Sequence, residues 1–326
     1  MAWKTRLTEA LGIQLPILLA PMGGAAGGKL AAAVTAGGGL GFIGAGYGDP
    51  AWIDREFAAA GNARVGCGFI TWSLANQPDL LDRVLAHAPA AVFLSFGDPA
   101  PFVPKIRAAG ARLICQVQTI AHTRAALAAG ADIIVAQGTE AGGHGALRAT
   151  MTLVPEVADL LARESPDTLL LAAGGIADGR GLAAALMLGA DGVVMGSRLW
   201  ATRECLIHPN HQKAAIAANG DATVRQIAAD IARGYDWPEE FTGRVLRTGF
   251  VERWHGHEAA HRATAATIRA DYMDAVATGR TDDAGVFVGE AIGLMHHIPA
   301  AADILATIST EAETLLRGRA AMVLSS

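Results

Sequence analysis

The chain has 326 residues, and its 31 acidic side chains outnumber its 26 lysines and arginines, giving a formal net charge of −5. This balance argues against nucleic acid as a partner, because binding to phosphate backbones needs a basic patch or stripe. No stretch approaches about 18 apolar residues without a charge, so a membrane span is not expected. The N-terminus has no apolar core of a secretory signal. We therefore expect a cytoplasmic protein that acts on small molecules.

Short apolar runs alternate with alanine-rich helical stretches along most of the chain, a pattern typical of β–α–β units. Several of these runs are apolar on both faces, as parallel strands covered by helices are. Strands are predicted at residues 17–20, 40–43, 65–70, 91–95, 113–117, 133–136, 169–172 and 192–195. Helices are predicted to begin near residues 28, 50, 76, 99, 119, 152, 178 and 299. Eight such units predict an α/β fold, a TIM (β/α)₈ barrel.

Residues 202–293 break this alternation. We assign them to a small helical insertion, or lid, after the eighth strand, and residues 1–201 and 294–326 to the barrel. Segments that follow barrel strands project from the C-terminal face, where barrel active sites lie. The insertion is therefore expected to cover the active site.

Glycine-rich loops are predicted directly after strands seven and eight. The first contains Ala173, Gly174 and Gly175, and the second contains Gly196 and Ser197. Glycine lets backbone N–H groups approach a ligand closely, and helix N-termini favour anions. Because TIM barrels commonly bind phosphate at these two loops, we predict a phosphate site there. The alternative is that these glycines only close tight turns.

A third glycine-rich loop, QGTEAGGHG at residues 137–145, follows strand six and contains His144. An imidazole can take or give a proton near neutral pH, which makes His144 a candidate acid–base catalyst. A lone histidine can equally be structural. After strand one, Ala20 precedes Pro21, which fixes the chain direction, and Met22, whose thioether could lie against a flavin. This segment could also be core packing.

Two matches to well-known motifs are not accepted. Residues 39–44 fit GxGxxG, but the dinucleotide fingerprint must follow a strand and open a helix, whereas the second half of this match is itself a predicted strand. Residues 257–261 fit the zinc motif HExxH, but the nearest later glutamate is Glu290 and no further histidine ligand follows at the expected spacing.

Cys67, Cys115 and Cys205 are widely spaced, so they indicate neither a disulfide framework nor a zinc site. We predict no metal.

Taken together, the motifs resemble those of the nitronate monooxygenase family, formerly called nitropropane dioxygenases, and of its relatives, the flavin-dependent enoyl-ACP reductases. The segments that carry this resemblance are APMGG, GGLGFIG, ICQVQT, QGTEAGGHG, AAGGIADGRG and GADGVVMGSR. The resemblance implies FMN across the barrel mouth, with its ring near Ala20, Pro21 and Met22 and its phosphate on Gly174, Gly175, Gly196 and Ser197. It also implies that Gln116, Gln137, Gly142 and Gly143 line the flavin and that His144 is catalytic.

The sequence departs from the family pattern at two places. Gln116 and Gln137 stand where some members that oxidise nitronates carry lysine and aspartate, and Gly68 stands where many relatives carry asparagine. These changes remove groups that tune or fix a flavin.

The resemblance implies oxidation of alkyl nitronates or nitroalkanes to carbonyl compounds and nitrite, with dioxygen as oxidant. One alternative is an NAD(P)H-dependent reductase of quinones or enoyl thioesters, in which His144 supplies a proton. Another is a flavin-binding or phosphate-binding module without turnover. NAD(P)H as electron donor and a homodimeric assembly are left open.

Overall fold

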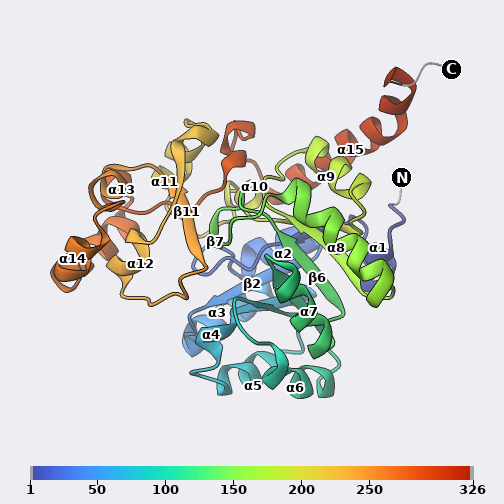
Figure 1. Ribbon diagram of the computed structural model, residues 1–326, viewed down its shortest axis with the longest axis horizontal. Helices are drawn as coiled ribbons and strands as arrows, with labels where there is room; N and C mark the ends of the chain where they lie inside the picture. Colours follow the sequence, from blue (N-terminus) through green and yellow to red (C-terminus); the bar gives the residue numbers. More distant parts are fainter. Residues whose placement is uncertain (1–2, 324–326) are drawn as a thin grey trace.

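Eight parallel strands close into a barrel in the computed structural model, which describes residues 3–323 (Figure 1). In spatial order the sheet runs β1-β9-β8-β6-β5-β4-β3-β2, and a bridge between Leu18 and Leu40 joins its two edges. The backbone N–H of Leu19 donates to the carbonyl of Leu40 over 3.0 Å at this seam. The strands are β1 (Ile17–Leu19), β2 (Gly41–Gly46), β3 (Val65–Ile70), β4 (Ala91–Ser95), β5 (Arg112–Val117), β6 (Ile133–Gln137), β8 (Leu169–Ala173) and β9 (Gly192–Met195). The predicted barrel and its eight strands are confirmed.

Helices cover the outside of the barrel, and several begin at a polar capping residue. The side chains of Asp49, Thr119 and Asp178 accept hydrogen bonds from backbone N–H groups in the first turn of α3, α7 and α9. The helices of the barrel are α1 (Arg6–Leu11), α2 (Gly28–Ala36), α3 (Pro50–Ala60), α4 (Thr71–Leu74), α5 (Asp79–Ala86), α6 (Val103–Ala108), α7 (Ile120–Ala129), α8 (Thr150–Glu164), α9 (Gly179–Met187) and α15 (Ala301–Val323). Among the described residues, no helix is long and apolar enough to cross a membrane.

Large apolar side chains fill the inside of the barrel. Phe42 and Phe93 are fully buried and meet edge to face, with their ring centroids 5.7 Å apart. A Cβ at Gly66 would overlap the Phe42 ring, so glycine at this strand position makes room for the aromatic pair. The floor of the barrel is therefore packed, and the open end that could hold a ligand is at the strand C-termini.

The segment predicted as a helical insertion contains strands as well as helices. It forms α11 (Pro209–Ile216), α12 (Ala228–Arg233), α13 (Gly249–Trp254) and α14 (Glu258–Thr278), together with β10 (Thr223–Gln226) and β11 (Thr242–Leu246). The short helix α10 (Ser197–Trp200) leads into this segment from β9.

A second, antiparallel sheet joins the segment to the barrel. Its order is β10-β11-β7, and its third strand, β7 (Gly143–Gly145), lies in the glycine-rich loop after β6. His144 pairs with Gly243 of β11, so the segment is bound directly to the loop that carries the candidate histidine. Figure 1 shows β7 and β11 between the barrel and the orange helices.

Candidate active site

The two predicted phosphate loops lie side by side at the barrel mouth, because β8 and β9 are neighbours and Ala173 pairs with Val194. Gly174 and Gly175 have φ angles of +102° and +72°, a region that favours glycine. A Cβ at Gly174 would lie only 2.9 Å from the carbonyl oxygen of Gly138. The backbone of this loop is thus bare and tightly placed, as a phosphate cradle requires.

The residues after β1 meet the loop after β9. A Cβ at Gly196 would lie 3.7 Å from both the Cβ of Ala20 and the Sδ of Met22, so these three predicted residues line one part of the mouth. Pro21 packs on the other side, where a Cβ at Gly68 would overlap its ring. Gly68, noted in the sequence as a departure from asparagine, is therefore needed for the position that Pro21 adopts.

Ser197 and Arg198 give the second predicted phosphate loop its polar character. The Ser197 hydroxyl oxygen accepts a hydrogen bond of 2.8 Å from the N–H of Gly289, and its own proton can still be donated to an anion. Arg198 is buried, and its Nη2 donates to the carbonyls of Ala201 and His297, whereas its Nε has no hydrogen-bond partner. Within residues 3–323 no carboxylate forms an ion pair with it. Burial lowers the pKa of this guanidinium. A buried positive charge without a counter-charge favours an anion nearby, which agrees with the phosphate predicted at this loop.

Glutamine side chains connect the ends of β5 and β6. The side-chain amides of Gln116 and Gln118 each donate to Oε1 of Gln137 over 3.0 Å. The amide of Gln137 in turn donates to the carbonyl of His144 over 3.1 Å. The two predicted glutamines are thus brought together with a third, and the network holds the backbone of the candidate histidine.

His144 is hydrogen-bonded to a carboxylate of the 202–293 segment. Its Nε2 lies 2.9 Å from Oδ2 of Asp230 on α12, while the other carboxylate oxygen of Asp230 is 2.6 Å from a guanidinium nitrogen of Arg233. The side chains of His144 and Asp230 are 9% and 3% exposed. Burial lowers the pKa of His144, and the hydrogen bond and charge of Asp230 oppose this only in part. The imidazole is therefore neutral at neutral pH and able to accept a proton.

Aromatic side chains surround the imidazole. Trp237 stacks on it with ring centroids 3.4 Å apart and planes 4° apart, and the rings of Phe96 and Phe287 lie at 6.3 and 5.7 Å. The indole N–H of Trp237 donates to the hydroxyl of Tyr47 over 2.9 Å. Burial raises the pKa of Tyr47 to about 12, so this phenol stays protonated. These aromatic rings thus shield the imidazole from water, while its charged neighbours are Asp230, Arg233 and Arg225.

The remaining predicted residues also reach the mouth. Gly143 is on β7 with φ of +73°, and a Cβ at Gly142 would lie 2.5 Å from the nitrogen of Gly289. Gly289 also donates to Ser197, so the loop after β6 and the loop after β9 both contact the segment around Gly289. The structure therefore brings the sequence-predicted set together at the C-terminal ends of the strands.

Sequence reasoning missed Asp230, Arg233, Gln118 and Trp237. One signal was available for Asp230: it is a lone carboxylate among alanine and isoleucine in α12, and a buried carboxylate normally has a partner. The partner, His144, is 86 residues away in sequence, which no local pattern could reveal.

The two rejected motifs lie outside this site. The GxGxxG match falls on β2 and does not open a helix. His261 of the HExxH match is buried against Trp254 and its Nε2 is 2.9 Å from the carbonyl of Ala228. Among residues 3–323, no group of three or more metal-ligating side chains is arranged to hold an ion. That the protein binds no metal stays a prediction.

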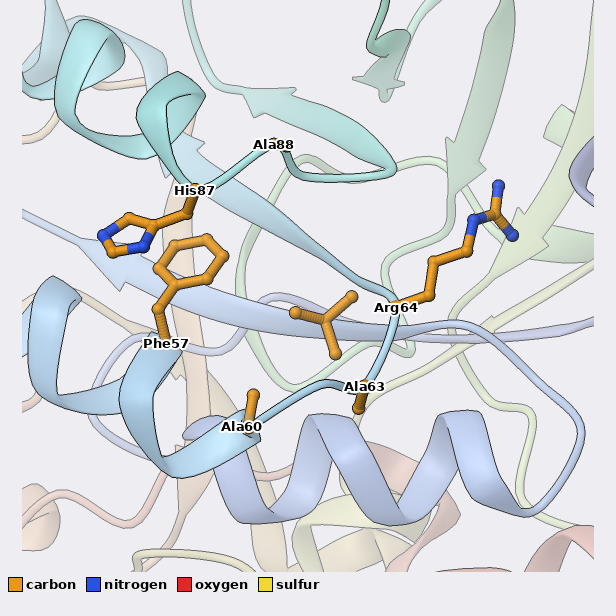
Figure 2. A pocket seen from close by; sticks show the side chains of 8 residues that line it. Phe57, Ala60, Ala63, Arg64, His87 and Ala88 are labelled. Carbon is orange, nitrogen blue, oxygen red and sulfur yellow. The ribbon is translucent and has the colours of Figure 1, made fainter.

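A small cleft of about 120 Å³ is present at the opposite end of the barrel. It lies where α3 ends and β3 begins, and Figure 2 shows the stacked rings of Phe57 and His87 on one side and Arg64 on the other. This cleft faces away from the strand C-termini and from His144.

The comparisons with known proteins cover nearly the whole chain. The sequence model of the nitronate monooxygenase family matches residues 4–64 and 69–311. Nitronate monooxygenase npaC from Metarhizium robertsii is 33% identical over 96% of this chain and 97% of that protein. The nitronate monooxygenase of Pseudomonas aeruginosa is 31% identical over 94% of this chain and 98% of that protein.

Two solved structures are similar over equally long stretches. FabK from Thermotoga maritima has a TM-score of 0.86 at 29% identity and covers 98% of this chain and 100% of its own. Nitroalkane oxidase from Streptomyces ansochromogenes has a TM-score of 0.77 at 26% identity and covers 95% of this chain and 98% of its own.

Proposed function

Because the chain belongs to the nitronate monooxygenase family, whose members are flavin-dependent oxidoreductases, we propose that it oxidises alkyl nitronates to carbonyl compounds and nitrite. The observation that carries this proposal is a neutral, buried imidazole at the mouth of a barrel whose glycine loops fit a flavin phosphate. FMN is the proposed cofactor and dioxygen the proposed oxidant.

The phosphate cradle supports FMN in preference to FAD. The proposed ligands are the backbone of Gly174, Gly175 and Gly196 and the hydroxyl of Ser197. The N–H of Gly289 donates to the hydroxyl of Ser197, so the segment around Gly289 lies against this loop, and we propose that it leaves little room for an adenylate beyond the phosphate. When bound, FMN would take electrons from the substrate and pass them to dioxygen.

His144 is the proposed base. When the substrate is a neutral nitroalkane, its imidazole takes the proton from the carbon that bears the nitro group. When the substrate is already a nitronate, no such proton remains, and the imidazole would bind the nitro oxygens. The aromatic rings of Phe96, Trp237 and Phe287 exclude water from this exchange. We propose that the 202–293 segment acts as the lid that supplies Asp230 and Trp237.

A second candidate function is reduction of an enoyl thioester or quinone with NAD(P)H as donor. The high TM-score of FabK, an enoyl-ACP reductase, favours it. In that reaction His144 would donate a proton to the substrate. The two candidates differ in which small molecule reduces the cofactor.

The identity of the cofactor tests the cradle. The purified protein should be yellow and release FMN. Replacing Gly175 by Asp should abolish flavin retention, because the new carboxylate would add bulk and negative charge beside the phosphate. A Cβ at Gly175 would also lie only 3.3 Å from the Cβ of Glu140. Gly61→Asp is the matched control, since Gly61 also has a positive φ of 60° but open space around it. A colourless protein that cannot be reconstituted with FMN would contradict the proposal that FMN is the cofactor.

Product analysis tests the reaction. Incubation of the yellow protein with ethyl nitronate in air should yield nitrite and acetaldehyde in equal amounts. Turnover of an enoyl thioester or a quinone with NAD(P)H, without nitrite release from a nitronate, would favour the second candidate.

A further inference from the structure

We propose that Asp230 is a positioning residue that fixes the tautomer of His144, so that Nε2 carries the proton and Nδ1 is the atom that accepts the substrate proton. This inference rests on the proposed role of His144 as base. It assigns a function to the 202–293 segment and specifies which edge of the imidazole faces the substrate.

The tautomer follows from the hydrogen bond to Asp230. A carboxylate can accept hydrogen bonds but not donate them, and Nε2 of His144 lies 2.9 Å from its Oδ2. In the neutral imidazole one ring nitrogen carries the proton and the other has the lone pair. Nε2 must therefore be the donor, and Nδ1 is left as the acceptor. Within residues 3–323, Nδ1 has no hydrogen-bond partner.

Arg233 holds Asp230 in the orientation in which Oδ2 accepts from Nε2 of His144. A guanidinium nitrogen lies 2.6 Å from Oδ1 of Asp230, one turn earlier on the same helix, so the second oxygen is directed to His144. The guanidinium itself lies over the rings of Phe287, Tyr235 and Tyr47, at 4.6, 5.3 and 5.6 Å from their centroids. The guanidinium is therefore held by the ion pair with Asp230 and by these aromatic rings.

Other contacts fix the imidazole ring. Trp237 covers one face of the ring at 3.4 Å, Asp230 occupies its Nε2 edge, and Gln137 holds the backbone carbonyl. A Cβ at Gly243, the β11 residue paired with His144, would lie 3.6 Å from Nε2. The Nδ1 edge remains for a substrate.

The charged groups that act on His144 are Asp230, Arg233 and Arg225. Burial lowers the pKa of the imidazole, the two arginines lower it further, and Asp230 raises it. The carboxylate thus has two effects, since it selects the tautomer and makes Nδ1 more basic than burial alone would allow.

Asp230→Asn gives a sharp test because of Arg233. A guanidinium has only donors, so it should take the amide oxygen of the asparagine and leave the NH₂ group facing Nε2. Nε2 must then accept, and the proton moves to Nδ1. We expect kcat for a neutral nitroalkane to fall by about 10²- to 10⁴-fold, the range of general acid–base catalysis, and kcat for the nitronate to fall much less. Asp282→Asn, an isosteric change in the same segment that caps α13, is the control.

Two further measurements separate positioning from a purely structural role. In the double variant His144→Ala/Asp230→Asn the loss should equal that of His144→Ala alone, because Asp230 acts through the histidine. Nitrogen-detected NMR of the imidazole should show the proton on Nε2 in the unmodified protein and on Nδ1 in Asp230→Asn. Losses that multiply in the double variant, or a proton on Nδ1 in the unmodified protein, would overturn the proposal.

The NMR result is independent of turnover. If the protein fails to oxidise nitronates but its tautomer still changes in Asp230→Asn, the proposed function fails and the positioning role stands. If nitronates are oxidised and the tautomer does not change, the positioning role alone fails.

Discussion

At the scale of single residues, His144 combines a buried ring with an Nδ1 that has no hydrogen-bond partner among residues 3–323. Replacing it by Ala should leave FMN binding largely intact, because the phosphate loops belong to β8 and β9. The rate with a neutral nitroalkane should fall by about 10²- to 10⁴-fold, since the base is lost. With a nitronate the loss should be smaller.

Steady-state kinetics with both substrate forms checks this contrast. A His144→Ala protein that holds FMN and converts nitroalkane and nitronate at unmodified rates would show that the histidine is structural. The pH profile adds a second check, because burial lowers the pKa of His144. The base should stay active below pH 6.5, the usual imidazole value, and lose activity only as the pH falls further.

At the scale of elements, the pairing of β7 with β11 fixes the backbone position of His144. Gly243 faces His144 across this pair, and a Cβ there would lie 2.9 Å from the ring of Phe287. Gly243→Val should therefore displace Phe287 and crowd Nε2 of His144, which would lie 3.6 Å from the new Cβ. Because a small misplacement of a catalytic group is costly, kcat with nitroalkanes should fall by about tenfold or more, while the barrel stays folded. Thr242→Val on the same strand is the control. Equal activity and melting temperature in both variants would contradict this account of the pair.

The sequence predicts the barrel elements well and the second sheet not at all. Strands such as β8 are apolar on both faces, and glycines or capping residues mark where the chain turns, so local patterns are sufficient. The Gly-His-Gly of β7 and the TVRQ of β10 have no apolar alternation, and they are strands because of partners far away in the chain. For the same reason the glycine loops of the site were predictable and the contact with Asp230 was not.

At the scale of the whole molecule, three buried histidines link stability to pH. Burial lowers the pKa values of His144, His211 and His261 in the folded protein. The unfolded chain, with imidazole pKa values near 6.5, binds protons more strongly, so protonation favours unfolding. The stability gained by burying these neutral imidazoles is fully present above about pH 6.5 and is lost as the pH falls below that value.

Melting temperatures at several pH values check this linkage. The melting temperature should be constant between about pH 7.5 and pH 7 and should fall as the pH is lowered below about 6.5, before most carboxylates titrate. Replacing His261, which is fully buried with Nε2 on the carbonyl of Ala228, by Phe should reduce the slope. A melting temperature that is constant or rises on acidification would contradict the burial of neutral imidazoles.

The electron donor distinguishes the proposed reaction from its alternative. The measurement that tests this most directly is anaerobic rapid mixing of the yellow protein with ethyl nitronate, NADH or NADPH, each alone, while the visible flavin absorbance is followed. We predict that the nitronate reduces the flavin at a rate at least equal to turnover in air and that neither nicotinamide does. Reduction by NADH or NADPH at turnover rate, with no change on adding the nitronate, would contradict the proposed function.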